Sequence, residues 1–411
     1  MNAISIIIIC AIAADAILHV AADMLNLGML KRQLPEAFAG WYDEGRYASS
    51  QDYLRVNTRF EWLVSGVTLA LFLILWFGKG FPLIDEWVRQ TAHSQVIRGL
   101  LYIGVLLFLK SLISLPFALY STFCIEEHFG FNRTTWKTFI ADRLKGLVLA
   151  AVLGGSMLAG ILIFFEYAGV YAWIYCWLAI GGFMLVMQLV APTWIMPLFN
   201  KFQPLSPGPL KSAIMDYAAS IDFPLKNVFI MDGSKRSRKS NAFFTGFGRH
   251  KRIVLYDTLV ADHFTEELVA VLAHEMGHYK KKHVLWMLLA GILQTGVMLY
   301  LLSLFISAPS LFAAFYIKEP SIYAGLVFFG ILFAPLDFFM GIAMQFFSRR
   351  NEYAADRFAV ETTHDAASFA TALKKLAVNN LSNLTPHPLY VVLNYSHPPV
   401  LERLKAISAA E

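Results

Sequence analysis

HEMGH at residues 274–278 ends about six residues before a long apolar run at 284–306. On an α-helix, residues four apart share one face, so His274 and His278 can offer ring nitrogens to one metal ion while Glu275 stands beside it. This spacing is typical of a metallopeptidase zinc site with a glutamate general base, although a pair of surface histidines is the alternative. The motif and the apolar run together predict a water-activating metal site close to a membrane.

The composition is that of an integral membrane protein. Hydrophobic residues make up 57% of the 411 residues and charged residues only 15%, whereas soluble domains carry about 25% charged residues. About 20 apolar residues in a helix cross ~30 Å of hydrocarbon. We therefore predict a mainly α, polytopic membrane protein with seven transmembrane helices, at 3–22, 62–78, 99–122, 146–165, 171–194, 284–306 and 322–346.

The lysines and arginines gather on one side of the predicted membrane. If the N-terminus lies outside, the inner segments 23–61, 123–145, 195–283 and 347–411 hold 5, 4, 13 and 7 of the 34 basic residues. We expect these segments to be cytoplasmic and the N-terminus to be outside or lumenal, in a bacterial inner membrane or the endoplasmic reticulum membrane. The net charge of +5 follows from this bias and from contact with anionic lipid, and it does not indicate nucleic-acid binding.

A third metal ligand is expected, because catalytic zinc sites use three protein ligands and leave a fourth position for water. Glu352 and Asp356 follow the last predicted span and, four residues apart, share one helix face. We predict Glu352 as the third ligand. Asp356 is predicted to accept a hydrogen bond from a ligand histidine and so to fix the orientation of its ring. A solvated, charged helix end is the alternative.

The last two spans explain how the motif and Glu352 can meet. His278 precedes the sixth span by about six residues, and Glu352 follows the seventh by about six. Two consecutive spans return to the same membrane face, so both ligand helices emerge side by side, and we expect the metal at the cytoplasmic membrane surface. We divide the chain into an N-terminal membrane region with five spans, 1–194, and a zinc peptidase domain that includes the last two, 195–411.

Two short strands are predicted ahead of the motif. The β-prone residues 240–244 and 253–256 flank Gly246 and Gly248, which is typical of a small β-hairpin. An edge strand beside the metal helix can hold an extended peptide by main-chain hydrogen bonds, although a purely structural hairpin is the alternative. The basic run at 235–239 is expected to be a solvated turn or a contact for lipid headgroups.

His397 stands on a proline-rigidified turn near the C-terminus, followed by a short amphipathic helix. Such a histidine can donate a hydrogen bond to the oxyanion of a tetrahedral intermediate, although a surface turn is the alternative. Other histidines stand in no partnering motif, and we expect structural or surface roles for them: His263, His283, His364 and His387.

Several blocks of sequence, in order, carry a family resemblance. They are Leu115 to Phe117, Ile125 to Asn132, Ile221 to Pro224, Gly233 to Ser237, Ser240 to Phe243, Lys251 to Leu255, HEMGH, Ser348 to Arg350 with Glu352 and Asp356, and Ser396 to Pro399 with Leu401 to Arg403. Through them nearly the whole chain resembles the integral-membrane zinc CaaX prenyl endopeptidases of the gluzincin type. Blocks in this order are far more specific than HExxH alone.

The resemblance implies a particular architecture. Seven helices would form a barrel around a water-filled intramembrane chamber, and a cytoplasmic gluzincin-like zinc domain with the small β-hairpin would close one end. Polar residues at membrane depth would then either face the wet chamber or pair between packed helices, because facing lipid is costly. They are Gln188, Gln294, Asp337 and Gln345.

The resemblance also implies roles for residues. One Zn²⁺ per chain would be held by His274, His278 and Glu352, with Glu275 as the base and Asp356 supporting a ligand from behind. The substrate-binding edge strand would include Asn241 and Ala242, His397 would orient the tetrahedral intermediate, and Arg403 would be a polar partner close to the substrate.

The function expected on these grounds is hydrolysis of peptide bonds near the C-terminus of CaaX-type, prenylated substrates. Glu275 would activate zinc-bound water and pass its proton to the leaving amine, with His397 assisting. Two other functions stay open: a membrane-protein quality-control metalloprotease without a prenyl requirement, and a seven-span transporter or channel with a vestigial motif. The expected partners are a peptide or protein substrate and membrane lipid, and we expect the chain to act as a monomer.

Overall fold

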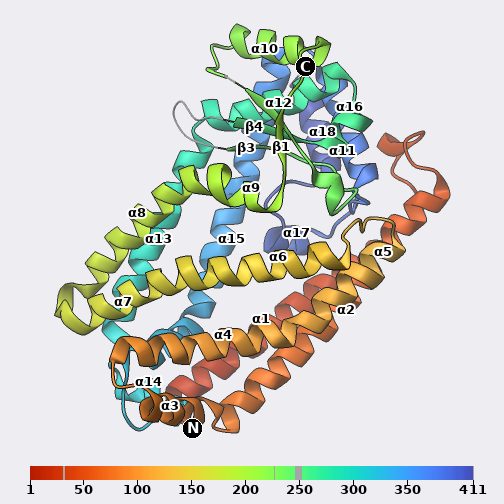
Figure 1. The fold of residues 1–411 in the computed structure, drawn as a ribbon. Helices are drawn as coiled ribbons and strands as arrows, with labels where there is room; N and C mark the ends of the chain where they lie inside the picture. The colour runs from red at the N-terminus through yellow and green to blue at the C-terminus, as the bar shows by residue number, and fades with distance from the viewer. Residues whose placement is uncertain (31–32, 226, 246–251, 411) are drawn as a thin grey trace.

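A computed structural model describes residues 1–30, 33–225, 227–245 and 252–410. Its helices include seven that are long and apolar enough to cross a membrane, and each coincides with one predicted span. Figure 1 shows these spans below a compact region that contains the sheet, with the two termini at opposite ends. The spans run Ala3–Gly28, Glu44–Phe77, Gln95–His128, Trp136–Tyr167, Gly169–Phe199, His283–Phe305 and Ile322–Thr363.

Two span helices extend well beyond the hydrophobic stretch that predicted them. Helix α2 (Glu44–Phe77) begins far ahead of residue 62. Asp43 caps its first turn by accepting a hydrogen bond from the backbone of Arg46 at 2.7 Å. Helix α15 (Ile322–Thr363) continues well past residue 346. Hydropathy detects only the part of a helix that lies in hydrocarbon, so the polar continuations were not predicted. The continuation of α15 carries Glu352 and Asp356.

Three of the spans contain a π-helical turn, a feature found mostly as a single turn inside an α-helix. These turns lie at Ser121–Ile125, Ala150–Gly154 and Ala191–Ile195, and the last contains Pro192. The helices on either side of them are α4 (Gln95–Tyr120) and α5 (Glu126–His128), α6 (Trp136–Leu149) and α7 (Gly155–Tyr167), and α8 (Ala172–Val190) and α9 (Met196–Phe199).

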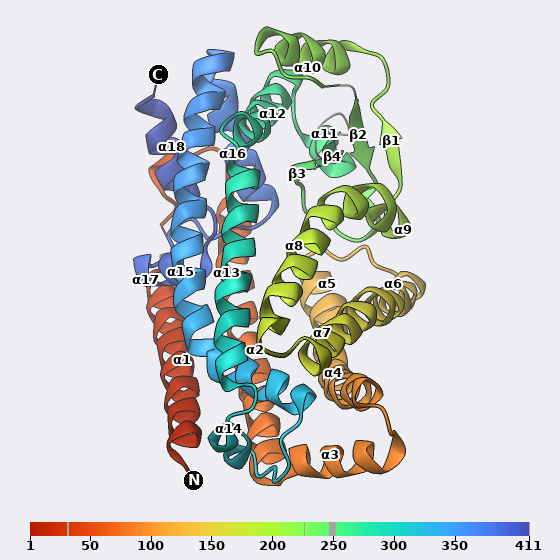
Figure 2. The ribbon, with the colours of Figure 1, turned by 90° about the vertical axis from the view of Figure 1, so that its left-hand side faces the viewer.

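The spans form a ring. Helix α1 (Ala3–Gly28) contacts α2, and α3 (Gly80–Thr91) joins α2 to α4. Helix α4 contacts α7, α7 contacts α8, α8 contacts α13 (His283–Phe305), and α13 contacts α15. Helix α15 contacts α1 and so closes the ring (Figure 2). Few side chains are buried along the membrane helices. The fully described stretches 59–75 of α2 and 334–351 of α15 contain no buried residue. The predicted barrel of seven helices is therefore confirmed.

Apolar cores instead lie at the two ends of the ring. One, near the N-terminus, gathers residues such as Trp76, Phe81, Phe315 and Phe328. The other fills the compact region around the sheet and includes Leu255 and Met276, with contributions from the N-terminal region such as Phe38 and Tyr47. The compact region is therefore packed onto the membrane part by a shared core.

Polar residues at membrane depth either pair with a neighbouring segment or line a cavity. The amide of Gln294 donates to Asp337 at 3.0 Å between α13 and α15, and Gln345 donates to the carbonyl of Leu393 at 3.1 Å. Gln188 instead lines a cavity beside α13. Pairing between neighbouring segments thus accounts for three of the four residues.

The predicted β-hairpin is part of a four-stranded sheet with the order β1-β2-β4-β3. Strand β3 (Ala242–Thr245) pairs antiparallel with β4 (Arg252–Tyr256), and their predicted turn with Gly246 and Gly248 lies outside the described residues. Strands β1 (Phe202–Pro204) and β2 (Val228–Met231) were not predicted, because three or four residues are too short for a recognisable alternation. Strand β3 lies at an edge of the sheet.

The remaining helices complete the compact region and the far end of the ring. Around the sheet lie α10 (Pro209–Ser220), α11 (Asp257–Asp262), α12 (Thr265–Lys280), α16 (Ala366–Asn379) and α18 (Val400–Ser408). Helix α14 (Pro309–Ala314) lies near the N-terminus, and α17 (Pro388–Asn394) packs against α1 and α15.

Candidate metal centre

Helix α12 carries the HEMGH motif through the peptidase core. Its start is fixed by Glu267, whose carboxylate accepts from the backbone of Phe264 at 3.1 Å and from Lys375 at 2.8 Å. Its end is a turn in which Lys282 adopts a left-handed conformation with φ of 59°. Helices α12 and α13 are therefore separate, whereas α15 runs unbroken from the membrane to Glu352.

The glycine of the motif lets α12 approach α15. A Cβ on Gly277 would lie 3.0 Å from Phe358 and 3.3 Å from the backbone of Ala355, both on α15. Contacts this short would force the neighbouring atoms of α15 to give by a few tenths of an ångström. Gly277 therefore allows the close crossing that brings the motif histidines to Glu352.

Three side chains converge where α12 and α15 cross. The Nε2 atoms of His274 and His278 are 3.2 Å apart, and Glu352 places Oε1 3.2 Å from His278 and Oε2 3.4 Å from His274. Tetrahedral zinc with bonds of about 2.0–2.1 Å to nitrogen and oxygen separates its ligand atoms by about 3.3 Å. Two imidazoles and a carboxylate are also a donor set of catalytic zinc. The cluster therefore fits a zinc ion in both spacing and chemistry.

Asp356 lies behind His274, as expected for a residue that orients a ligand. Its Oδ1 is 2.8 Å from Nδ1 of His274. Arg403 of α18 holds the same carboxylate by two hydrogen bonds, of 2.9 and 2.6 Å, and reaches within 3.9 Å of Glu352. Arg403 therefore bonds to Asp356 in this structure, and any contact with substrate would come in addition.

Burial and nearby charges set the protonation of the motif. Burial raises the pKa of Glu275 above its ordinary value, although His274, His278 and the backbone amide of Phe244 oppose this shift. Burial disfavours the charged ring of His274, but hydrogen bonds with Asp356 and Glu352 outweigh it and raise its pKa to about 9. A carboxyl with a raised pKa is suited to accept a proton near neutral pH.

His397 reaches the cluster from the C-terminal turn. Its Nε2 lies 3.4 Å from Oε1 of Glu352, and Ser396 contacts its Nδ1 at 2.9 Å. The side chain is nevertheless 64% exposed, so its ring borders both the cluster and the solvent. This position leaves a ring nitrogen within reach of a substrate atom bound at the cluster.

The edge strand lies against the motif helix. Strand β3 contacts α12, and Phe244 packs on Tyr279 at 5.4 Å between ring centroids. Asn241 starts the strand by accepting a hydrogen bond from the backbone of Ala242 at 2.8 Å. Within the described residues β3 pairs with β4 alone, so its other edge can accept an extended peptide.

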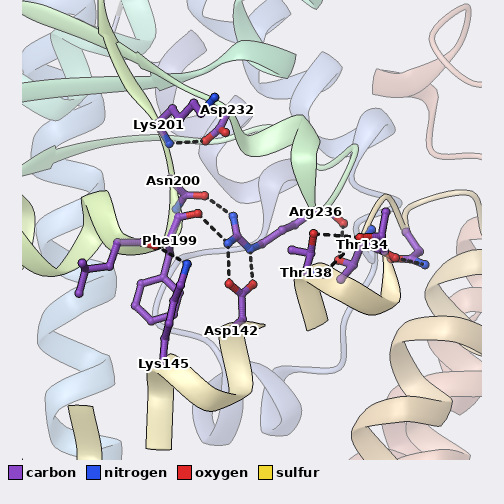
Figure 3. Close-up of polar contacts among 12 residues, drawn as sticks. Thr134, Thr138, Asp142, Lys145, Phe199, Asn200, Lys201, Asp232 and Arg236 are labelled. Atoms are coloured by element: carbon purple, nitrogen blue, oxygen red, sulfur yellow. Dashed lines mark hydrogen bonds and ion pairs between the residues drawn. The ribbon is translucent and has the colours of Figure 1, made fainter. Parts of the chain in front are cut away.

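The loop before β3 is fastened to the membrane helices by Arg236 (Figure 3). Its guanidinium donates to both oxygens of Asp142 on α6, at 2.8 and 2.9 Å, and to the carbonyl of Phe199 at 2.7 Å and the side chain of Asn200. Farther along the loop, Lys239 donates a hydrogen bond to Tyr53 at 2.8 Å and forms an ion pair with Glu126 of the membrane region. Two cations of the basic run thus make internal contacts, so the expectation of a solvated turn or lipid contact is wrong for them.

His283 is a further residue at the site, for which we expected only a structural or surface role. It is the first residue of α13 and is buried, with its Nδ1 3.1 Å from Nδ1 of His278. On one continuous helix, residues five apart point about 140° away from each other, so their spacing gave no signal. The turn at Lys282 brings the two rings together.

Comparison with known proteins places the chain in a family. A sequence model described as "CAAX prenyl protease N-terminal, five membrane helices" matches residues 25–201, and one described as "Peptidase family M48" matches residues 204–411. The chain belongs to peptidase family M48. It is 35% identical to a CAAX prenyl protease 1 homolog of Arabidopsis thaliana, over 95% of this chain and 94% of that protein.

Other M48 relatives extend this likeness to the fold. The chain is 36% identical to CAAX prenyl protease 1 of Saccharomyces cerevisiae, over 91% of this chain and 88% of that protein. The crystal structure of S. mikatae Ste24p matches with a TM-score of 0.93 and 32% identity, over 99% of both chains. The expected resemblance is confirmed: this M48 protein is an integral-membrane metalloendopeptidase, and the comparisons favour that function over a transporter or channel.

Proposed function

We propose that this M48 peptidase is a zinc enzyme that cleaves near the C-terminus of prenylated CaaX proteins. The observation that carries the proposal is the cluster of His274, His278 and Glu352, whose ligand atoms lie within 4.8 Å of one another beside Glu275. The names of its relatives, CAAX prenyl proteases with about the same length, support the substrate class.

The proposed roles follow from where each side chain lies. His274, His278 and Glu352 would hold one zinc ion, which supplies a Lewis acid for the scissile carbonyl and makes a water more acidic. Glu275 takes the proton of the attacking water and delivers it to the leaving amine. His397 donates a hydrogen bond to the developing oxyanion, while Asp356, held by Arg403, keeps His274 in place.

The substrate would bind as an added strand. The free edge of β3, with Asn241 and Ala242 at its start, is next to the motif helix, so an extended peptide paired with it would pass Glu275. The cavity beside His278, lined by Met184, Met287 and Leu288, adjoins this site and offers apolar surface at membrane depth. We also propose that the chain acts as a monomer in contact with membrane lipid.

The proposed orientation places the metal cluster in the cytoplasm. Seven spans put the termini on opposite faces, and the excess of basic residues on the segments that carry the cluster supports a cytoplasmic position for them. We retain the division into a membrane region, 1–194, and a peptidase domain, 195–411. A cysteine placed at Lys211 should react with an impermeant maleimide only when the cytoplasmic face is exposed; reaction in sealed, right-side-out membranes would contradict this orientation.

The decisive experiment compares two peptides that differ only in the lipid. The purified protein is incubated with a farnesylated CaaX peptide and its unfarnesylated counterpart, and mass spectrometry locates the cut. We expect cleavage after the modified cysteine, loss of activity on chelation and recovery with one zinc ion per chain. Equal cleavage of both peptides would instead favour the quality-control protease, and zinc-independent cleavage would contradict the proposed metal.

A further inference from the structure

The two motif histidines are oriented by different kinds of partner. His274 contacts a carboxylate, with 2.8 Å between its Nδ1 and Asp356. His278 contacts a second imidazole, with 3.1 Å between its Nδ1 and Nδ1 of His283. The rings of His278 and His283 meet edge to face, with centroids 5.1 Å apart and planes at 76°. Because the two Nδ1 atoms are 3.1 Å apart, one ring can donate a hydrogen bond to the other, and the tautomers decide which ring donates.

The position of Nε2 decides where the proton of His278 lies. Nε2 faces both Glu352, at 3.2 Å, and the Nε2 atom of His274, at 3.2 Å, so it is the atom that would bind the metal. A nitrogen that binds metal uses its lone pair, so a neutral ring carries its proton on the other nitrogen. The Nδ1–H of His278 therefore donates, and Nδ1 of His283 accepts. His283 in turn carries its own proton on Nε2.

A neutral acceptor suits the charges around this cluster. The carboxylates of Glu275, Glu352 and Asp356 bring three negative charges, while Arg403 and a divalent metal bring three positive ones. A carboxylate behind the second histidine would bring a further charge into a buried position, which is costly unless that charge is fully paired. An imidazole supplies the hydrogen bond without that charge.

We propose that His283 is a positioning residue that holds His278 in the metal-binding tautomer and orientation. The left-handed Lys282 between α12 and α13 makes the contact possible, and His283 is buried, with 8% exposure, where the two helices meet. It is not one of the three proposed ligands, and it acts through His278. This inference rests on the proposed role of His278 as a metal ligand.

The test measures zinc affinity in variants that keep or lose a hydrogen-bond acceptor at position 283. His283→Asn places an amide oxygen close to where Nδ1 lies and should retain most of the zinc affinity, whereas His283→Leu should lose about 10–100-fold, typical for loss of such a supporting partner. Zinc affinity is measured by competition with a chromophoric chelator. In the cobalt-substituted protein, the visible spectrum should shift for Leu and stay close to that of the wild type for Asn.

His263→Leu is the matched control, because His263 is also buried with 8% exposure, but among the described residues its ring hydrogen-bonds only to the carbonyl of Leu259. It should leave zinc affinity and the cobalt spectrum unchanged. If His283→Leu does not fold, His283→Gln, whose amide lies one carbon farther out, takes its place with the same expected loss. Wild-type affinity in the Leu or Gln variant, or an equal loss in Asn, would overturn the inference. Failure of the wild type to bind zinc would instead contradict the proposed function.

Discussion

In the membrane ring, only 6–22% of the residues in each span's apolar window are buried, whereas nine of the sixteen residues of α12 are buried in the peptidase region. The ring helices form a single layer, so other parts of the protein cover few of their side chains. The motif helix is surrounded by the sheet, α15 and α16. The same chain thus contains a membrane part in which the protein buries few residues and a catalytic part in which it buries many.

The free-energy cost of leaving a polar side chain unpaired therefore differs between the two regions. Gln294 and Asp337 pair between the adjacent ring helices α13 and α15 while remaining exposed. In the peptidase region, the side chains of Asp356 and Arg403 are only 2% and 12% exposed and bond to each other. An unpaired polar group is costly where water cannot reach it, and less so in a wet interior. Variants in the two regions should therefore differ strongly in their effects.

Replacing the base should produce the largest change. Glu275→Gln removes the proton acceptor but not a ligand, so we expect kcat to fall by about 10²–10⁴-fold with zinc content unchanged. Peptide cleavage and elemental analysis check both parts. Glu266→Gln, an exposed position on the same helix, is the control and should behave as the wild type. Undiminished hydrolysis by Glu275→Gln would contradict the mechanism.

Zinc affinity should depend on pH through His274. Its pKa of about 9 lies above the ordinary 6.5, so at pH 7 the metal-free site holds a proton that zinc must displace. Affinity should therefore rise as pH increases toward 9, by up to about tenfold per unit. For the metal-free fold the sign is opposite: the protonated ring stabilises it fully below pH 6.5, and this contribution is lost as pH approaches 9.

Calorimetric titrations with zinc, in buffers of different ionisation heat, measure this proton release directly. We expect about one proton released per zinc at pH 7 and fewer above pH 9. An affinity that stays constant from pH 7 to 9 would contradict the assignment of the proton to His274.

Removing the charge of Asp356 should weaken both metal binding and folding. Asp356→Asn leaves Arg403 buried without its partner, so we expect zinc affinity to fall about 10–100-fold and stability by about 3–5 kcal/mol. Chelator competition and thermal unfolding in detergent measure the two effects. Glu361→Gln, an exposed acid farther along α15, is the control. Wild-type values for Asp356→Asn would show that the buried pair has little influence.

The contact between the two regions should have an intermediate effect. Arg236→Met leaves Asp142 without its guanidinium, and because both side chains are about a quarter exposed we expect a loss of about 1–3 kcal/mol. The loop before β3 should also become more sensitive to limited proteolysis. Arg238→Met, at an exposed neighbouring position, should change neither property. Equal proteolysis of both variants would contradict the role of Arg236 in holding the loop.

The smallest effect is expected within the ring. Asp337→Asn keeps an acceptor for Gln294 in an exposed setting, and hydrogen bonds between membrane helices contribute only about 0.6 kcal/mol on average. The thermal midpoint and peptidase activity should therefore remain close to those of the wild type. A loss as large as that in Asp356→Asn would show that the middle of the ring is packed more tightly than its low burial indicates.

Features that depend on neighbouring residues could be predicted from the sequence, whereas contacts between residues far apart in the chain could not. The spans and the pattern of the motif depend on neighbouring residues, so composition and helical spacing sufficed to predict them. The short strands β1 and β2 lacked such a signal, and the basic run around Arg236 was misjudged because its partners, Asp142 and Asn200, lie far away in the chain. Asp356 was predicted beside a ligand histidine, but its bond to Arg403 could not be read from spacing.

Helical period and hydropathy are local properties, so the sequence alone could predict seven spans, a motif helix with His274 and His278 on one face, and Glu352 on the same membrane side. How the site is held depends on contacts between separate helices, which became visible only in the structure. The close crossing at Gly277 aligned the ligand atoms, and the turn at Lys282 placed His283 behind His278. Both depend on the packing and direction of separate helices, which no spacing within a single helix encodes.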